Sequence, residues 1–293
     1  MNELIHTLGE HELFSSAGST IGPYHIQENL PNQDAYDLIA TDDFLVLAVA
    51  DGAGSLARSD EGSELAVEAG AGMAADLLLG HKRNGTTPNL EKILAESILE
   101  ARSAVFTLDY WREAGSTLVL AAVTKESFAV AALGDSFAVV QAMNGSLDLV
   151  QPPAVGEFAN ITKLITSSNP TVSICTGKTG DLRGLAVCSD AFEHSSLEQR
   201  VPTKGFWNTI FSMASKGNLS VKQLIDFMDS QGKIEDDATM VAVAITGSTL
   251  EESQEVEFIH SEYNLQELKD LAEVRASSAT RPRGLPDNII LDF

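Results

Sequence analysis

The chain has 293 residues and is strongly acidic, with 42 Asp and Glu against 19 Lys and Arg and a formal net charge of −23. This charge repels nucleic acid phosphates and anionic lipids, so we expect neither a nucleic acid nor a membrane partner. A hydrophobic content of 44% is enough for a sizeable core in one large domain or two small ones. The acidic balance itself is explained by solubility, with local attraction of cations as the alternative.

Cysteine usage and the N-terminus indicate the compartment. The only cysteines are Cys175 and Cys188, so no disulfide framework is expected. The first 14 residues are polar and are predicted to form an edge strand or a loose arm. They lack the basic and apolar regions of a signal peptide, and no segment reaches the ~18 apolar residues of a membrane span. We therefore expect a cytoplasmic protein.

The first strong elements are a strand and two helices. An apolar run at 44–50 predicts a buried strand and leads directly into Asp51-Gly52-Ala53-Gly54. A helix is predicted over 59–79, because apolar residues recur at helical spacing, and a second over 89–108.

Four further strands follow, with an irregular connection after them. The expected strands lie at 116–123, 127–133, 137–143 and 147–150. Gly134-Asp135 and Asn144-Gly145 read as two-residue hairpin turns, which predicts an antiparallel meander. Residues 151–180 contain three prolines among Ser, Thr and Gly, and this composition predicts a long irregular segment such as a flap over a site.

The remaining pattern completes an α+β fold. A strand at 182–189, helices at 204–215 and 220–230, and a strand at 238–245 are predicted. Because strands and helices come in groups, we expect a four-layer α-β-β-α sandwich with two mostly antiparallel sheets covered by helices.

A domain boundary is placed at residue 247, which gives a domain of residues 1–247 and a C-terminal extension of residues 248–293. The role of this extension is not indicated by the sequence. Its apolar stripe at Leu265, Leu268 and Leu271 must cover the back of the domain, a second copy or another protein.

Aspartates recur at the ends of the predicted strands. Asp51, Asp135 and Asp190 each follow an apolar run, and Asp236 precedes one. Each aspartate alone is typical of a turn. Together they form a set of hard oxygen ligands without a matching set of His or Cys, which favours Mg²⁺ or Mn²⁺.

The order of several short blocks resembles one known family. The blocks are Asn32-Gln33-Asp34-Ala35, Val49-Ala50-Asp51-Gly52-x-Gly54, Gly115-Ser116-Thr117, Ala132-Leu133-Gly134-Asp135-Ser136, Ser189-Asp190 and Asp236-Asp237-Ala238-Thr239. Over about residues 15 to 247 the chain resembles the metal-dependent Ser/Thr protein phosphatases of the 2C type, the PPM family. Gly22-x-x-His25 followed by Pro31-x-Gln33-Asp34 is similar to a bacterial branch of it.

This resemblance implies a metal-dependent hydrolysis of phosphoserine and phosphothreonine in proteins. It implies that Asp51 bridges two Mn²⁺ or Mg²⁺ ions, that the Gly52 carbonyl binds one of them, and that Asp190 and Asp236 complete the shell of the second. Asp135 would help to hold a third ion. The implied partners are a phosphorylated protein substrate and a cognate Ser/Thr kinase, and the oligomeric state is not indicated.

Asp34 completes the implied catalytic set, in which it would hold metal-bound water from a second shell. The full implied set is Asp34, Asp51, Asp190 and Asp236. A pair of divalent ions about 3.5–4 Å apart activates water and clamps the oxygens of a phosphoryl group.

Several positions depart from the family pattern. Gln33 replaces a Glu, Ala53 stands where some members have a His, Ala191 replaces a Gly, Asp237 replaces a frequent Asn, and Asn29 stands where many members place a phosphate-binding Arg. These departures support an alternative, a weak or inactive pseudophosphatase that acts as a binding or regulatory module. A further alternative is an acidic interaction module whose aspartates are turn residues only.

Two cations are candidates to replace the missing Arg. His25 is expected to be a buried or capping histidine, with a substrate role as the alternative. Arg58 is expected to be a solvated loop residue, again with substrate binding as the alternative.

Overall fold

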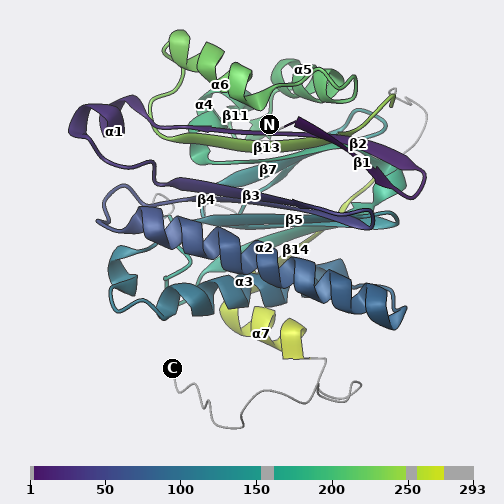
Figure 1. Ribbon diagram of the computed structural model, residues 1–293, viewed down its shortest axis with the longest axis horizontal. Helices are drawn as coiled ribbons and strands as arrows, with labels where there is room; N and C mark the ends of the chain where they lie inside the picture. Colours follow the sequence, from purple (N-terminus) through teal and green to yellow (C-terminus); the bar gives the residue numbers. More distant parts are fainter. Residues whose placement is uncertain (1–2, 153–161, 249–255, 274–293) are drawn as a thin grey trace.

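The computed structural model describes residues 3–152, 162–248 and 256–273, which form two stacked sheets between two layers of helices (Figure 1). Sheet A has the strand order β1-β2-β13-β10-β7-β8, and sheet B has the order β14-β9-β6-β5-β4-β3. Neighbouring strands in both sheets are antiparallel. The predicted four-layer α-β-β-α sandwich is therefore confirmed.

The strands have the following bounds. Sheet A contains β1 Glu3–Leu8, β2 His11–Thr20, β13 Ala238–Ile245, β10 Leu182–Cys188, β7 Phe137–Ala142 and β8 Leu147–Val150. Sheet B contains β14 Ile259–Asn264, β9 Thr171–Lys178, β6 Ser127–Leu133, β5 Leu118–Thr124, β4 Phe44–Asp51 and β3 Asp34–Ala40. A separate short hairpin pairs β11 Leu197–Glu198 with β12 Val201–Pro202.

The helices cover the outer faces of the two sheets (Figure 1). Sheet B is covered by α2 Ser59–Asn84 and α3 Leu90–Phe106, with α7 Leu265–Glu273 against α3. Sheet A is covered by α5 Lys204–Ala214 and α6 Val221–Ser230. The short helices are α1 Pro23–Glu28 and α4 Glu193–Ser196, and the 3₁₀ turns are η1 Trp111–Glu113, η2 Thr179–Asp181 and η3 Asp190–Phe192.

Strand β4 illustrates why several strands have continuous apolar sequences. Its even-numbered residues from Phe44 to Ala50 belong to the core between sheet B and the helices. Leu45, Leu47 and Val49 belong to the core between the two sheets. Because both faces of the strand are buried, the usual alternation of polar and apolar residues is lost.

The helix predicted over 59–79 continues one further turn, to Asn84. It ends where Gly85 adopts a left-handed conformation with φ of +61° and donates its N–H to the carbonyls of His81 and Lys82. The second helix begins after Asn89, whose side chain accepts a hydrogen bond from the Lys92 N–H at 3.1 Å. Its observed range of 90–106 agrees with the predicted 89–108.

The predicted meander is wrong at Gly134-Asp135. Strands β6 and β7 lie in different sheets, so this turn carries the chain from sheet B to sheet A instead of closing a hairpin. Gly134 has a φ of +98°, and a Cβ there would lie 2.6 Å from Cγ2 of Thr117. The crossover therefore requires glycine at position 134, because its backbone lies close to Thr117, the residue before β5. The hairpin at Asn144-Gly145 is confirmed by the pairing of β7 with β8.

The irregular segment predicted over 151–180 is wrong at its C-terminal end. Residues 171–178 form β9, which lies inside sheet B between β6 and β14. The prolines and small polar residues before it conceal a strand whose Val172 and Ile174 are buried under the helices. Residues 153–161 of the predicted flap lie outside the described residues.

The C-terminal extension is integrated with the domain as far as it is described. Strand β14 pairs along its length with β9. Leu268 of α7 is fully buried in the core under sheet B, and Leu271 packs against that core. The predicted stripe therefore covers the back of this domain. None of the helices in the described ranges is long and apolar enough to cross a bilayer.

We expect Leu268→Ala to lower the free energy of unfolding by about 3 kcal/mol, because it leaves a cavity in a closed core. The measurement is urea denaturation of the full chain. Ile259→Ala is the matched control on β14, since this side chain is 68% exposed, and it should change the free energy by less than about 0.5 kcal/mol. Equal effects of the two substitutions would contradict the packing described for α7.

Candidate metal centre

Three of the predicted aspartates meet at one end of the sandwich. Asp51 ends β4, Asp135 lies in the crossover after β6, and Asp190 follows β10. Each offers a carboxylate oxygen, and these three oxygens lie within 4.8 Å of one another. Residues from both sheets therefore converge on one place, as the sequence predicted for a site at strand ends.

A pair of hydroxyl groups holds this cluster in place. The Asp51 N–H donates to Thr117 Oγ1 at 2.9 Å, and the Thr117 N–H donates to the Asp51 carbonyl at 2.8 Å. Thr117 Oγ1 is also 2.7 Å from Ser136 Oγ, next to Asp135. The sequence motifs contain both residues, but their supporting role follows only from the contact between β5 and the crossover.

Asp135 is hydrogen-bonded to the segment that follows strand β8 in the chain. The Thr162 hydroxyl donates to its Oδ2, and the Gln151 side-chain amide donates to its backbone carbonyl. The two ends of the partly described connection at 151–162 are thus anchored at the cluster.

Burial makes the ionised cluster unfavourable without a cation. Burial raises the pKa of Asp51 well above its ordinary value, and the carboxylates of Asp34 and Asp190 raise it further. Burial and the charge of Asp135 raise the pKa of Asp190 to about 6. Among the described residues, no Lys, Arg or His forms an ion pair with any member of the cluster. Close carboxylates of this kind fit the oxygen-rich shell of a hard divalent ion.

Asp34 lies beside the cluster. It is the first residue of β3 and is paired in the ladder with Asp51 of β4. Both of its carboxylate oxygens are buried. Burial raises its pKa to about 8, the hydroxyls of Ser189 and Thr239 act in the opposite direction, and the charge of Asp237 raises it further. A buried carboxylate whose neighbours supply hydroxyl groups and no cation fits a position next to bound cations and their water.

Gly52 allows tight packing behind Asp51. Its N–H donates to the Gln33 carbonyl at 3.0 Å, and a Cβ at Gly52 would lie 2.7 Å from that carbonyl oxygen and 2.8 Å from the Ser59 carbonyl oxygen. The Gln33 side chain is buried, and its Oε1 is without a partner in the described structure. The glycine is therefore required by the surrounding backbone, whether or not its carbonyl binds a metal.

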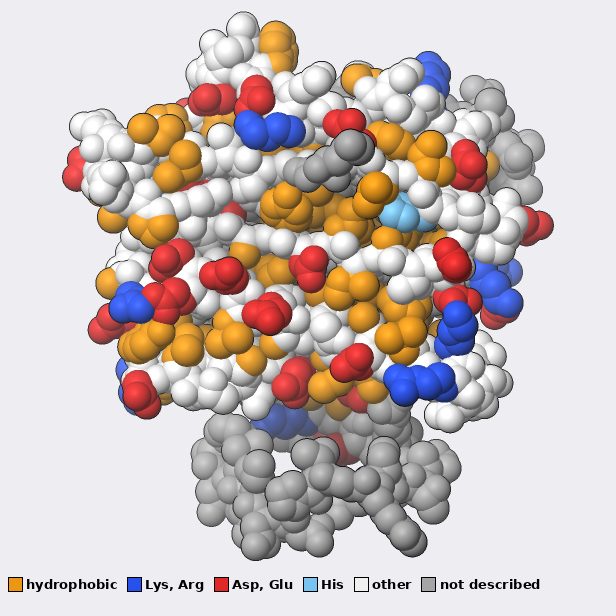
Figure 2. Space-filling model, viewed as in Figure 1, with side chains coloured by type: hydrophobic (Ala, Val, Ile, Leu, Met, Phe, Trp, Pro, Cys, Tyr) orange, Lys and Arg blue, Asp and Glu red, His pale blue; other side chains and the backbone are white. Residues whose placement is uncertain are grey.

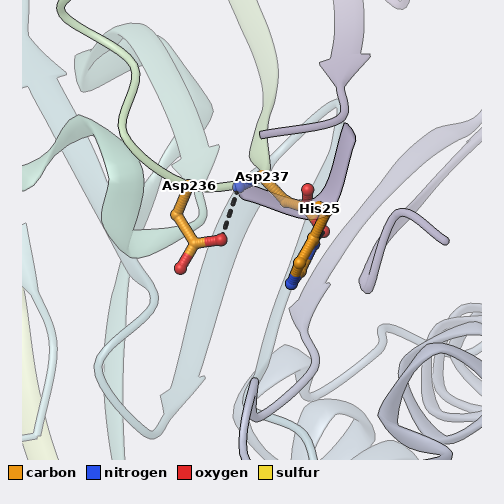
Figure 3. A group of neighbouring side chains, drawn as sticks. All are labelled: His25, Asp236 and Asp237. Carbon is orange, nitrogen blue, oxygen red and sulfur yellow. Dashed lines mark hydrogen bonds and ion pairs between the residues drawn. The ribbon is translucent and has the colours of Figure 1, made fainter. Parts of the chain in front are cut away.

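The neighbours Asp236 and Asp237 differ sharply in their surroundings (Figure 3). Asp237 is buried and accepts three hydrogen bonds, from the Gly22 N–H at 2.6 Å, from His25 Nδ1 at 2.8 Å and from the Gln33 N–H at 2.5 Å. Asp236 is exposed, and its Oδ1 accepts the Asp237 N–H at 2.8 Å. Asp237 is thus a structural anchor, while Asp236 presents its carboxylate to solvent.

Gly22 and His25 fix the N-terminal segment against this anchor. A Cβ at Gly22 would lie 2.5 Å from the Asp236 carbonyl carbon, so only glycine fits. His25 lies in the short helix α1, is 4% exposed and pairs with Asp237. The expectation of a buried histidine is confirmed, and its commitment to Asp237 argues against the substrate role.

Arg58 is also committed to protein partners. Its guanidinium pairs with Glu61 and lies 4.6 Å from the centroid of the Tyr110 ring, while Tyr110 also donates to Glu61.

Asn29, at the position of the missing Arg, adopts a left-handed conformation at the C-terminal end of α1. On the face drawn in Figure 2, acidic side chains are spread among neutral ones rather than gathered.

A polar cavity of about 540 Å³ lies beside the cluster, with Asp190 and Asp236 in its wall. The charge of Asp236 also raises the pKa of Asp190. The structure therefore brings Asp51, Asp135 and Asp190 into one cluster, and places Asp34 and Asp236 next to it.

Comparison with known proteins is consistent with this arrangement. A family model described as "Protein phosphatase 2C" matches residues 21–229. Serine/threonine-protein phosphatase 3 of Escherichia coli (strain K12) is 30% identical over 191 residues, which are 61% of this chain and 73% of that protein.

Solved structures show a similar fold. Serine-threonine phosphatase 2C from Toxoplasma gondii matches with a TM-score of 0.58 and 14% identity, over 83% of this chain and 98% of that chain. The catalytic domain of the serine threonine protein phosphatase PstP, in complex with two manganese ions, matches with a TM-score of 0.51 and 17% identity, over 80% and 98% of the two chains. At these identities the structural matches support the fold alone.

We expect Asp237→Ala to destabilise the protein by about 3 kcal/mol, because it leaves three buried donors without an acceptor. Asp236→Ala is the matched control one residue away, and it should cost less than about 1 kcal/mol because Asp236 is exposed. Chemical denaturation in EDTA measures both. A larger loss for Asp236→Ala would reverse the roles assigned here.

The metal-free protein should lose stability as the pH rises. The pKa values of Asp190 and Asp34 are raised to about 6 and about 8, above the unfolded value of about 3.9, so their protonated forms stabilise the fold. This contribution is complete below about pH 4 and is lost as the pH passes through these values. Urea denaturation in EDTA from pH 4 to pH 9 tests this.

Asp34→Asn is the matched variant for this pH series. It removes a group whose pKa is raised to about 8, so the fall between about pH 7 and pH 9 should become smaller in the variant than in the native chain. Identical pH profiles of the two proteins would show that Asp34 does not have the raised pKa.

Proposed function

The chain belongs to the protein phosphatase 2C family, and we propose that it hydrolyses phosphoserine and phosphothreonine in proteins with the aid of two or three Mn²⁺ or Mg²⁺ ions. The observation that carries this proposal is the convergence of Asp51, Asp135 and Asp190 within 4.8 Å. Three partly buried carboxylates without a described cationic partner fit divalent ions and have no evident role in folding.

We assign the metal ligands on this basis. Asp51 holds the ions at the centre, with the carbonyl of Gly52 as a further ligand. Asp190 and Asp236 supply carboxylates from sheet A, and Asp135 supplies one from the crossover. This assignment is supported by the cluster geometry for three of them and by the shared cavity wall for Asp236.

The ions, when bound, supply charge to activate water and to neutralise a phosphoryl group. The residues of the chain do the positioning. Thr117 and Ser136 fix Asp51 and the crossover relative to each other, and Asp237 fixes the position of Asp236 and of the segment that enters β3. Asp34 presents a buried carboxylate, which can orient water beside the cluster.

The substrate class follows from the family. A protein phosphatase acts on phosphorylated proteins, and a Ser/Thr kinase that produces them is the implied counterpart. No observation in the described structure favours an inactive pseudophosphatase, since the acidic set is complete. Gln33 and Ala53 remain departures whose effect on turnover has to be measured.

We expect Asp51→Asn to lower kcat/KM on a phosphothreonine peptide at least about a hundredfold under saturating Mn²⁺, because it removes the central ligand. The same substitution should weaken the stabilisation that Mn²⁺ gives in a thermal melt. Asp76→Asn, on the exposed side of α2, is the matched control and should leave both unchanged.

Two results would contradict the assignment. If Asp51→Asn kept more than about a tenth of native turnover at saturating Mn²⁺, Asp51 would not be a direct ligand. If the native chain bound Mn²⁺ but hydrolysed no phosphopeptide, the proposal of an active phosphatase would give way to a metal-binding regulatory protein.

A further inference from the structure

The cavity beside the metal centre contains one lysine. Two segments form its wall, the turn that follows β10 and the turn that joins α6 to β13. The side chains that matter are Asp190 and Asp236, the acids Glu193 and Glu235, and the basic residues His194 and Lys233. The cavity is therefore acidic, with four carboxylates and a single lysine among the residues that line it.

The backbone at Lys233 is held firmly. The Lys233 N–H donates to the Met228 carbonyl at 2.9 Å, and the Gly232 N–H donates to the Asp229 carbonyl at 2.8 Å. Gly232 has a φ of +63°, which closes the end of α6. The next residue, Ile234, is 2% exposed in the core under α5 and α6. Lys233 thus projects from a fixed point.

The Lys233 side chain is exposed and is available for a ligand. None of the ion pairs found within the described ranges involves it. Two arginines are committed to other partners, since Arg58 pairs with Glu61 and Arg200 donates to the Pro152 carbonyl.

A phosphate group that binds in this cavity meets Asp190 and Asp236, because both line it. The phosphate carries about two negative charges and meets Glu193 and Glu235 as well. Bound metal ions would neutralise the charges of Asp190 and Asp236, but Glu193 and Glu235 would still repel the phosphate. A cation in the same wall offsets this repulsion and donates hydrogen bonds to phosphate oxygens.

We propose that Lys233 binds the phosphate group of the substrate in this cavity, with His194 as a neighbouring contact. This inference rests on the proposed function and assigns it a substrate-binding cation that the sequence motifs do not identify. Lysine suits the role as a point charge on a flexible stem that follows the phosphate through the reaction.

The test compares Lys233→Ala, Lys233→Arg and the native chain. We expect Lys233→Ala to raise KM for a phosphothreonine peptide about tenfold, with kcat within about threefold, since a charged contact to the bound phosphate is lost. Lys233→Arg keeps the charge and should restore KM to within about threefold. The Mn²⁺ concentration for half-maximal activity should not change.

Lys216→Ala is the matched control for charge. Lys216 is an exposed lysine near the opposite end of β13, where the Gly247 N–H donates to the Ser215 carbonyl. It should leave KM unchanged. If Lys216→Ala raised KM as much as Lys233→Ala, general electrostatics would explain the effect and the proposal would fail.

A second measurement separates this inference from the proposed function. Calorimetric titration of inorganic phosphate into the Mg²⁺-loaded protein reports on the cavity without turnover. We expect Lys233→Ala to weaken phosphate binding about tenfold, even if no phosphopeptide is hydrolysed and the proposed function fails. An unchanged phosphate affinity together with an unchanged KM would overturn the role of Lys233.

Discussion

The repulsion among carboxylates at one end of the sandwich is the constraint on which the site depends. Asp51, Asp135 and Asp190 are held together although burial disfavours the ionised forms of Asp51 and Asp190. Three large apolar cores, between the sheets and under both helix layers, keep the strand ends in place against this repulsion. A divalent cation turns the same arrangement from unfavourable to favourable, so the fold supplies rigidity and the ion supplies the missing charge.

Hydrogen bonding separates the structural aspartate from the functional ones. Asp237 accepts three hydrogen bonds and is fully used in joining β13 to the N-terminal segment. The carboxylate of Asp34 is also buried, but only the hydroxyls of Ser189 and Thr239 act on it as hydrogen-bond donors. In the sequence both residues are aspartates within the same family-like blocks. Only their partners reveal that Asp237 is an anchor, whereas Asp34 lies beside the cluster without a backbone donor.

The sequence predicted the layers and the placement of aspartates at strand ends, for physical reasons that also explain its errors. Runs such as 44–50 are apolar on both faces, and a strand between two cores must have this pattern. The crossover at Gly134-Asp135 has the composition of a hairpin turn, because a positive φ and a tight approach require glycine in either case. Which sheet receives β7 depends on contacts with β10, and these are invisible in the local sequence.

The site was predicted only as far as residue type allows. Aspartates at strand ends indicate a cation site. Strands β3, β9 and β14 have mixed polarity, so no apolar run in the sequence predicts them. The roles of Thr117, Ser136 and Lys233 depend on distant segments meeting in space. The exclusion of His25 from substrate binding depends on its contact with Asp237, which lies 212 residues away in the chain.

The pairing of β2 with β13 has a consequence for synthesis of the protein. These strands are neighbours in sheet A, with Thr20 opposite Ala238, although more than two hundred residues separate them. On the ribosome, β2 leaves long before its partner exists, and domains generally fold as units during synthesis. Closing so long a loop is slow compared with forming the local β5-β6 and β7-β8 hairpins. These hairpins can therefore form early, whereas the pairing of β2 with β13 waits until the strand after Asp237 has been made, and β14 completes sheet B later still. The acidic end of the molecule is therefore incomplete in a nascent chain that still lacks β13.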